Sequence, residues 1–311
     1  MEKSAPLANF LYESNNAMAK HFQSWFLALT LLLPFGGGLS AQTLTNYSEG
    51  RPNILDGAYV PETNWLKRVI PYPDIREADV FYKKRIWQEM DLNQKFNHPY
   101  YFPTKPTHDR QNLFDVIREA LTSSNELWDA YYAGELGDDD EFNTKLTPAQ
   151  IEETFFETVD NFVFDDNGEV MDTLPPTRRL IESTDITRYR LKEEWIWDRQ
   201  RSERYVRIIG IAPMKERNEN GEISYKPLFW LYYPEWRHVF ARASAYNTFN
   251  DSQRRTYLDL FEKRYFTSYI IKEDNAFDRP IASYARGMDA LAESERIKEL
   301  LFNMEHDMWH Y

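Results

Sequence analysis

The sequence predicts an α+β fold in which an antiparallel β-meander packs with several helices, preceded by an extended N-terminal arm. Residues 195–237 contain three runs rich in β-branched and aromatic residues, separated by turn-forming stretches at 198–202 and 218–221. The segments on both sides of this block repeat apolar residues at helical spacing. Residues 42–76 contain four prolines, which interrupt helices and sheets alike.

The N-terminus is typical of a signal peptide. A short basic start precedes an apolar run at residues 25–35 and a glycine-rich exit. This run is shorter than the roughly 20 residues that a membrane-spanning helix needs. We therefore expect residues 1–41 to be removed by cleavage between Ala41 and Gln42. Met18 is a candidate for the true start, because the stretch before it is unusually polar.

The predicted arm spans residues 42–76. Its prolines lack a backbone donor, so we expect an extended conformation rather than a helix or a sheet strand. Its apolar residues are scattered, and Ile54, Tyr59 and Trp65 would be buried only against a neighbouring protein. We expect the arm to mediate assembly and to contribute little to the core.

A single α+β domain is predicted over residues 77–311. Residues 77–97 are expected to form a helix, and Asp109 is expected to cap a second helix that runs to Leu121. Residues 147–150 (TPAQ) have the sequence of a capping box with proline at the first helical position. A third helix should follow them.

Further turn and helix signals flank the meander. Residues 165–168 (DDNG) predict a β-hairpin, and Pro175-Pro176 predicts a break before the meander. Three helices are expected after the meander: residues 235–248, residues 252–271, and a C-terminal helix with Ile297, Leu301, Met304 and Met308 on one face.

Composition excludes several functional classes. The net charge of −13 argues against a nucleic-acid partner, because phosphate binding needs clustered Lys and Arg. The absence of cysteine excludes disulfides, thiolate catalysis and cysteine-ligated metals, and also the lipid attachment of a bacterial lipoprotein. We therefore expect the mature protein to reach a membrane only through a partner.

No catalytic, cofactor or metal site is predicted. His306 and His310 have a spacing that suits a metal, but they lack the H-E-x-x-H order and an identified third ligand. The acidic stretches 138–140 and 165–168 lack the ligand spacing of a calcium loop. A solvated loop and a turn account for them more simply.

The first strand of the meander carries two pairs with a possible role in glycan chemistry. Glu193 and Glu194 are adjacent, so on a strand they would face opposite sides and could not flank one glycosidic bond. Trp195 and Trp197 share a face, and a buried face of the sheet is the simpler explanation.

Arg199 and Arg201 cluster at the first turn of the meander and are candidate interface residues. They could bind an acidic partner, or they could balance some of the 50 carboxylates of the chain.

Several sequence stretches, in order, resemble one known family. They are residues 198–202 (DRQRS), 206–213 (VRIIGIAP), 228–234 (LFWLYYP), 264–273 (RYFTSYIIKE) and 305–311 (EHDMWHY). Together they resemble the GldN/PorN family of the type IX secretion and gliding-motility machinery of the Bacteroidetes.

This resemblance implies a periplasmic, non-catalytic subunit without a cofactor, which builds a ring beneath the outer membrane. The implied partners are an outer-membrane lipoprotein of the same system (the K subunit), the periplasmic region of the inner-membrane-anchored motor (the M subunit), and further copies of the chain. The alternative is a periplasmic glycan-binding module or glycan hydrolase. Exposed coplanar tryptophans in a groove would favour that alternative, whereas buried tryptophans would favour a scaffold.

Overall fold

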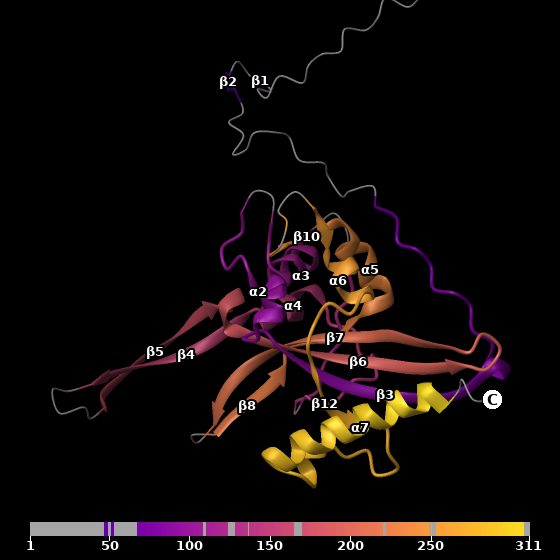
Figure 1. Cartoon of the computed structure of the whole chain (residues 1–311). Coiled ribbons are helices and arrows are strands. Elements are labelled where there is room, and N and C mark those ends of the chain that lie inside the picture. Colours follow the sequence, from indigo (N-terminus) through magenta and orange to yellow (C-terminus); the bar gives the residue numbers. More distant parts are fainter. Residues whose placement is uncertain are drawn as a thin grey trace, which may run out of the picture. The chain divides into compact units, whose positions relative to one another are not determined.

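A computed structural model of the chain describes residues 67–107, 110–123, 128–135, 137–164, 170–219, 222–248, 250 and 253–307 (Figure 1). It also gives the backbone of two short paired strands, β1 (Tyr47–Ser48) and β2 (Arg51–Pro52). The chain divides into two units, Met1–Glu62 and Thr63–Tyr311, and every element after β2 belongs to the second. The predicted cleavage site at Ala41 and Gln42 and the arm residues Ile54, Tyr59 and Trp65 lie outside the described residues.

An antiparallel sheet forms the centre of the second unit, in the strand order β12-β3-β6-β7-β8, with β9 beside β7. The predicted meander is confirmed, because β6, β7 and β8 follow one another along the chain and pair in that order. The strands are β3 (Val80–Asp91), β6 (Ile186–Asp198), β7 (Glu203–Glu219), β8 (Glu222–Pro227), β9 (Leu231–Tyr232) and β12 (Tyr269–Glu273).

The helix predicted over residues 77–97 is wrong, because most of this segment is strand β3. A 3-10 turn, η1 (Glu77–Asp79), precedes the strand, which pairs with β6 from Val80 opposite Asp198 to Asp91 opposite Arg188. Every side chain from residue 86 to residue 90 is buried. Both faces of the strand are therefore covered, and the alternation of apolar and polar residues that identifies a strand is lost.

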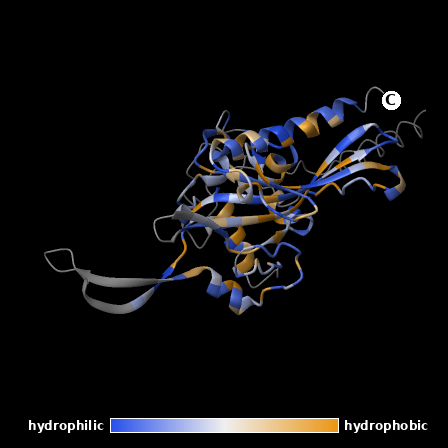
Figure 2. Cartoon of the chain, turned by 90° about the horizontal axis from the view of Figure 1, so that it is seen from below, coloured by the Kyte–Doolittle hydropathy of each residue, from blue (hydrophilic) through white to orange (hydrophobic). Residues whose placement is uncertain are grey.

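Short helices lie above the sheet in the view of Figure 1, and the long helix α7 (Met288–Asp307) lies below it. Figure 2 shows apolar residues gathered around the sheet and the short helices, whereas α7, which runs toward the marked C-terminus, is mainly hydrophilic. The short helices are α2 (His98–Tyr101), α3 (Leu113–Thr122), α4 (Pro148–Thr154), α5 (Tyr233–Arg242) and α6 (Tyr257–Glu262), with a 3-10 turn, η2 (Lys95–Asn97), before α2.

Three clusters of buried side chains hold the described elements together, and the smallest of them consists of Trp87, Tyr131, Ala133, Ala212 and Trp230. The main cluster lies between the sheet and the short helices and includes Met90, Tyr189, Leu191, Ile211, Phe114, Trp236, Phe240, Tyr257 and Phe261. The second cluster joins α7 to the sheet and consists of Ile86, Trp195, Trp197, Ile270, Ile281, Ile297 and Leu301. The predicted apolar face of the C-terminal helix is confirmed at Ile297 and Leu301, both of which are buried.

The helix boundaries differ from the predicted ones where local capping decides them. The capping box of Thr147 and Gln150 is confirmed at the start of α4. The preceding helix, α3, begins instead after Asn112, whose side chain accepts a hydrogen bond from the Asp115 amide at 2.8 Å. Helix α5 begins at Tyr233 and ends at Arg242, before the predicted end at residue 248.

The single helix predicted over residues 252–271 is wrong. Helix α6 ends at Glu262, and residues 269–273 form strand β12. Arg264, with φ of 51°, turns the chain out of the helix. Leu258 and Phe261 of α6 are buried, whereas Tyr265 and Tyr269, which continue their helical spacing in the sequence, lie beyond the end of α6 and are half-buried.

The predicted hairpin is confirmed as β4 (Phe156–Phe164) and β5 (Val170–Leu180), which project from the sheet in Figure 1. The predicted break at Pro175-Pro176 is wrong, because both prolines lie inside β5. The pairing register shifts between Val159 and Asn161, directly opposite them. This irregularity accommodates two residues that cannot donate to the ladder.

The last ten residues of the predicted arm, 67–76, belong to the second unit and contact its α5 and α6. The Lys67 ammonium donates to Thr256 Oγ1 at 2.9 Å and forms an ion pair with Asp259. Val69 packs on the main cluster, and the Ile70 carbonyl accepts from Arg237 at 2.8 Å. This part of the arm therefore makes specific contacts with the rest of the unit, although none of its residues is buried.

Candidate functional site

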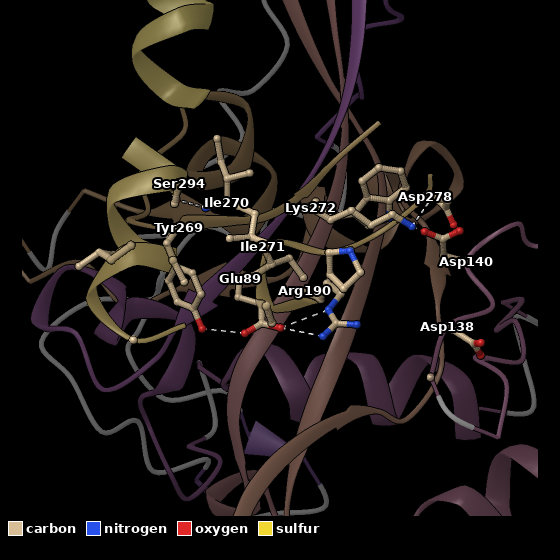
Figure 3. Close-up of a pocket in the computed structure, with 18 of the residues that line it drawn as sticks. Glu89, Asp138, Asp140, Arg190, Tyr269, Ile270, Ile271, Lys272, Asp278 and Ser294 are labelled. Carbon is tan, nitrogen blue, oxygen red and sulfur yellow. Dashed lines mark hydrogen bonds and ion pairs between the residues drawn. The ribbon is translucent and has the colours of Figure 1, made fainter. Parts of the chain in front are cut away.

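A cleft of about 800 Å³ opens beside strand β12. Its walls come from three parts of the chain: the sheet, the acidic loop that includes residues 137–140, and residues 278–294 at the start of α7. Figure 3 shows Glu89 and Arg190 on one side, Lys272, Asp278 and Asp140 on another, and Ser294 beside Ile270.

Glu89 is the centre of the polar floor of the cleft. It accepts hydrogen bonds from Arg190 Nη2 at 2.7 Å, from the Tyr269 hydroxyl at 2.7 Å and from Arg188 Nη1 at 3.3 Å. Burial alone would raise the pKa of Glu89, but the charges and hydrogen bonds of these partners lower it below the ordinary value. Glu89 is therefore held as a carboxylate whose binding capacity is largely used within the protein.

Arg188 shows that the sheet is strongly curved. Its guanidinium carbon lies 3.7 Å from the centre of the Tyr225 ring, on β8, and its Nη1 donates to the Tyr269 hydroxyl, on β12, at 2.7 Å. β8 and β12 are the two ends of the strand order, yet both contact one side chain of β6. The concave face on which these residues meet forms the floor of the cleft.

The acidic loop is tied to the same face of the sheet. Asp140 accepts from the Trp87 indole and forms an ion pair with Lys192 at 3.2 Å. Burial lowers the pKa of Lys192, although Asp140 opposes this shift. At Gly137, φ is +78° and an added Cβ would lie 2.6 Å from Pro227, so glycine allows the loop to cross β8. This loop is thus packed against the sheet through Asp140, whereas Asp138 is exposed, as the predicted solvated loop requires.

The third wall is mainly apolar. It is lined by Pro280, Ile281, Ala282, Ala290 and Leu291, from the approach to α7 and its first turns. Ser294 of α7 accepts a hydrogen bond from the Ile270 amide at 2.8 Å, which caps part of the outer edge of β12. The cleft therefore combines a charged floor with an apolar side wall.

The predicted interface residues lie elsewhere, at the β6–β7 turn. Arg199 is exposed, and its guanidinium lies 5.6 Å from the Phe81 ring. Arg201 is exposed and lies 3.6 Å from the Asp198 carboxylate. Neither is among the described residues that line the cleft.

The acidic and aromatic pairs of β6 have the arrangement predicted from strand alternation. Glu193 is completely buried, whereas Glu194 forms ion pairs on the other face, with Lys83 at 3.4 Å and Arg85 at 3.1 Å. Trp195 and Trp197 are 8% and 0% exposed and belong to the second cluster. They form a buried face of the sheet.

Sequence reasoning missed Glu89, Arg190 and Tyr269, the residues that organise the cleft. Glu89 lies opposite Arg190 of β6, a register that only the long-range pairing of the two strands sets. The helix assigned to residues 77–97 and the helix assigned to residues 252–271 concealed this relationship.

Within the described part of the chain, no group of three or more His, Cys, Asp or Glu side chains is arranged to hold a metal ion. His310, one of the two histidines considered for such a site, lies outside that part. Among the same described residues, no helix combines the length and apolar character required to span a membrane.

Comparison with known proteins identifies the family. The model of the family described as gliding motility associated protein GldN matches residues 75–310. Comparison with curated proteins gives no match. The family match includes the sheet, the short helices and the cleft, and it covers more than half of the chain. The chain therefore belongs to the GldN family of gliding-motility and type IX secretion proteins.

Proposed function

We propose that the protein is a non-catalytic structural subunit of the periplasmic ring of the type IX secretion and gliding-motility machinery. Membership of the GldN family supports its place in this machinery. The observation that carries the structural role is that the buried carboxylates Glu89 and Glu193 and the buried tryptophan rings are engaged in contacts within the protein.

The charged groups illustrate this point. General acid–base catalysis needs a titratable group within reach of a substrate proton. Glu89 instead accepts from three side chains, and the fully buried Glu193 accepts from Gln88, Trp195 and Arg264. These carboxylates are suited to holding strands together rather than to transferring protons.

The tryptophans favour a scaffold over the glycan-binding or glycan-hydrolase alternative. Sugar recognition by aromatic residues needs an accessible ring face. Trp87, Trp195, Trp197, Trp230 and Trp236 are all less than 9% exposed. None of these five rings offers a flat exposed platform on which a sugar could stack.

We propose three partners: the outer-membrane lipoprotein of the same system (the K subunit), the periplasmic region of the motor (the M subunit), and further copies of the chain. Arg199 and Arg201 support a contact at the β6–β7 turn, because both are exposed there. The arm residues Ile54, Tyr59 and Trp65 are proposed to contribute burial on a neighbour.

Periplasmic localisation follows from the predicted signal peptide, and attachment to the outer membrane would come through the lipoprotein. Mass spectrometry of the periplasmic protein should find a mature N-terminus at Gln42. Peptides from residues 25–35 retained in the mature protein would contradict this cleavage.

Affinity purification of the tagged chain from detergent-solubilised envelopes tests the proposal. The lipoprotein and the motor subunit should co-elute, in an assembly whose native mass requires several copies of the chain. The double variant Arg199→Glu/Arg201→Glu should reduce recovery of a partner, whereas Lys298→Glu, at an exposed position of α7, should not. Elution as a lone monomer, together with binding to peptidoglycan, would support the glycan alternative instead.

A further inference from the structure

We propose that the cleft beside β12 is a docking site for an extended segment of a partner polypeptide that alternates basic and apolar side chains. This inference goes beyond the proposed function, since it would stand even if the protein did not build a ring.

The side wall supplies the apolar part of the site. Leu291 lines the cleft and is 56% exposed. Met288, which follows the cleft residue Gly287, is 79% exposed, and Phe277, which precedes the cleft residue Asp278, is 77% exposed. Single exposed apolar residues are normal; here Leu291 lines the cleft itself, and Met288 and Phe277 each adjoin a lining residue in the sequence, which together favour an interaction surface.

Charge determines what kind of segment would bind. The cleft is lined by four carboxylates, on Glu89, Asp138, Asp140 and Asp278, and by two cationic side chains, on Arg190 and Lys272. Both cations are already paired, Arg190 with Glu89 at 2.7 Å and Lys272 with Asp278 at 2.6 Å. Asp140 is paired as well, with Lys192 at 3.2 Å, so Asp138 is the one lining carboxylate without an ion pair to a described residue, and it favours a Lys or Arg side chain on the ligand.

Asp138 is the carboxylate best placed to receive that side chain. It is exposed at the mouth of the cleft, and Figure 3 shows it apart from the paired groups of the floor. No described residue forms an ion pair with it. Asp140, by contrast, already holds Lys192 and the Trp87 indole.

Buried tryptophan rings disfavour a sugar as the ligand. Trp230 lines the cleft and is only 1% exposed. The faces of Trp87 and Trp230 are too buried for stacking against a sugar ring. The volume of the cleft lies within the range of roughly 300–1,000 Å³ that is usual for ligand sites.

Fluorescence polarisation with synthetic peptides tests the inference on the purified chain. The probe is a fluorescein-labelled peptide of sequence GSLKLKLKSG, and the comparison peptides are GSLELELESG and GSSKSKSKSG. We expect saturable binding of the first peptide and at least about tenfold weaker binding of each comparison peptide, because one loses charge complementarity and the other loses apolar burial.

Paired variants separate docking in the cleft from general attraction to an acidic protein. Leu291→Glu and Asp138→Lys should each weaken binding by about tenfold or more. Phe302→Glu and Glu299→Lys, which make the same changes at exposed positions of α7 outside the cleft lining, should leave it unchanged. If Leu291→Glu alters the melting temperature, Leu291→Ser serves in its place, because it removes the apolar side chain without introducing a charge.

Three results would overturn the inference. One is the absence of saturable binding, and a second is equal weakening by the cleft variants and their α7 controls. The third is displacement of the probe by muropeptides at lower concentration than by unlabelled peptide, which would assign the cleft to glycan. Failure to recover the lipoprotein in the envelope experiment would leave the peptide result intact, so the two proposals can fail separately.

Discussion

Arg264 Nη1 donates to Glu193 Oε1 at 2.8 Å, and the Glu193 side chain is completely buried. The same carboxylate accepts from Gln88 at 2.9 Å and from the Trp195 indole at 3.0 Å. Along β6, Glu193 lies between Leu191 of the main cluster and Trp195 of the second. A charge is thus buried between the two clusters, and Arg264 neutralises it from the turn after α6.

Replacing Arg264 by methionine should destabilise the protein by about 3 kcal/mol, because it leaves the Glu193 charge buried without its ionic partner. Urea denaturation measures the free energy of unfolding. Lys298→Met is the control, because Lys298 and Glu295 form a solvent-exposed pair, whose loss should cost less than about 1 kcal/mol. Similar losses in the two variants would show that the Glu193 charge is not the decisive feature.

Trp197→Ala should lower the free energy of unfolding by about 3–5 kcal/mol, since the side chain is fully buried in the second cluster. The Trp197 ring also packs edge-on against the Tyr82 ring, with 5.1 Å between the ring centres. Thermal and urea denaturation measure the effect. Phe302→Ala, at a position that is 63% exposed, provides a large-to-small control with little expected change. Unchanged stability of Trp197→Ala combined with loss of glycan binding would favour the binding-module alternative.

The sequence was most informative where local pattern and tertiary environment agree. The alternation along β6 correctly predicted that Trp195 and Trp197 share a buried face, which belongs to the second cluster, although Ile196 and Asp198 are buried as well. It failed for residues 86–90 of β3, where both faces are covered and the period of two disappears. A run of buried residues does not by itself distinguish a strand from a buried helix.

The cleft could not be predicted because its residues meet only after long-range strand pairing. Glu89 is 101 positions from Arg190 and 180 positions from Tyr269. The motifs that sequence analysis can search for are short and local, whereas this site depends on the curvature that brings β8 and β12 to Arg188. The sequence shows that residues 138–140 are acidic, but it does not reveal that Asp140 pairs with Lys192 of β6.

Stability below neutral pH should depend measurably on Glu89. Its pKa is lowered in the folded protein despite burial, through Arg190, Tyr269 and Arg188. Such a group adds stability above its unfolded-state pKa, about 4.3, and this contribution is lost as the pH falls through the lower folded-state pKa. The unfolding free energy of the unmodified protein should therefore fall more steeply with acidification than that of Glu89→Gln.

Urea denaturation at intervals from about pH 3 to about pH 7 covers this window. Near neutral pH, Glu89→Gln should be the less stable protein, because Arg188 and Arg190 lose their carboxylate partner. The difference in unfolding free energy between the two proteins should become smaller as the pH falls. Parallel curves for the two proteins would contradict the prediction, and Glu295→Gln, on the exposed side of α7, provides the control for removal of one carboxylate.

Two nested deletions separate the roles of the arm. Tyr72 stacks 3.8 Å from the guanidinium of Arg237, which is only 7% exposed and also donates to the Ile70 carbonyl. Deleting residues 42–66 spares these contacts and should leave the melting temperature unchanged. Deleting residues 42–76 should lower the free energy of unfolding by about 2 kcal/mol or more. The deletion removes the Tyr72 ring that stacks on Arg237 and the Ile70 carbonyl that accepts a hydrogen bond from it.

Both deletions should abolish recovery of the lipoprotein partner and of higher assemblies, if residues 42–66 find their burial on a neighbour and are ordered there. Co-purification and native mass measure assembly, and thermal melting measures the fold. Tyr72→Ala in the full-length chain should lower stability while preserving assembly, since it weakens the packed segment without removing residues 42–66. Normal assembly after deletion of residues 42–66 would mean that the partner contacts lie on the folded body instead.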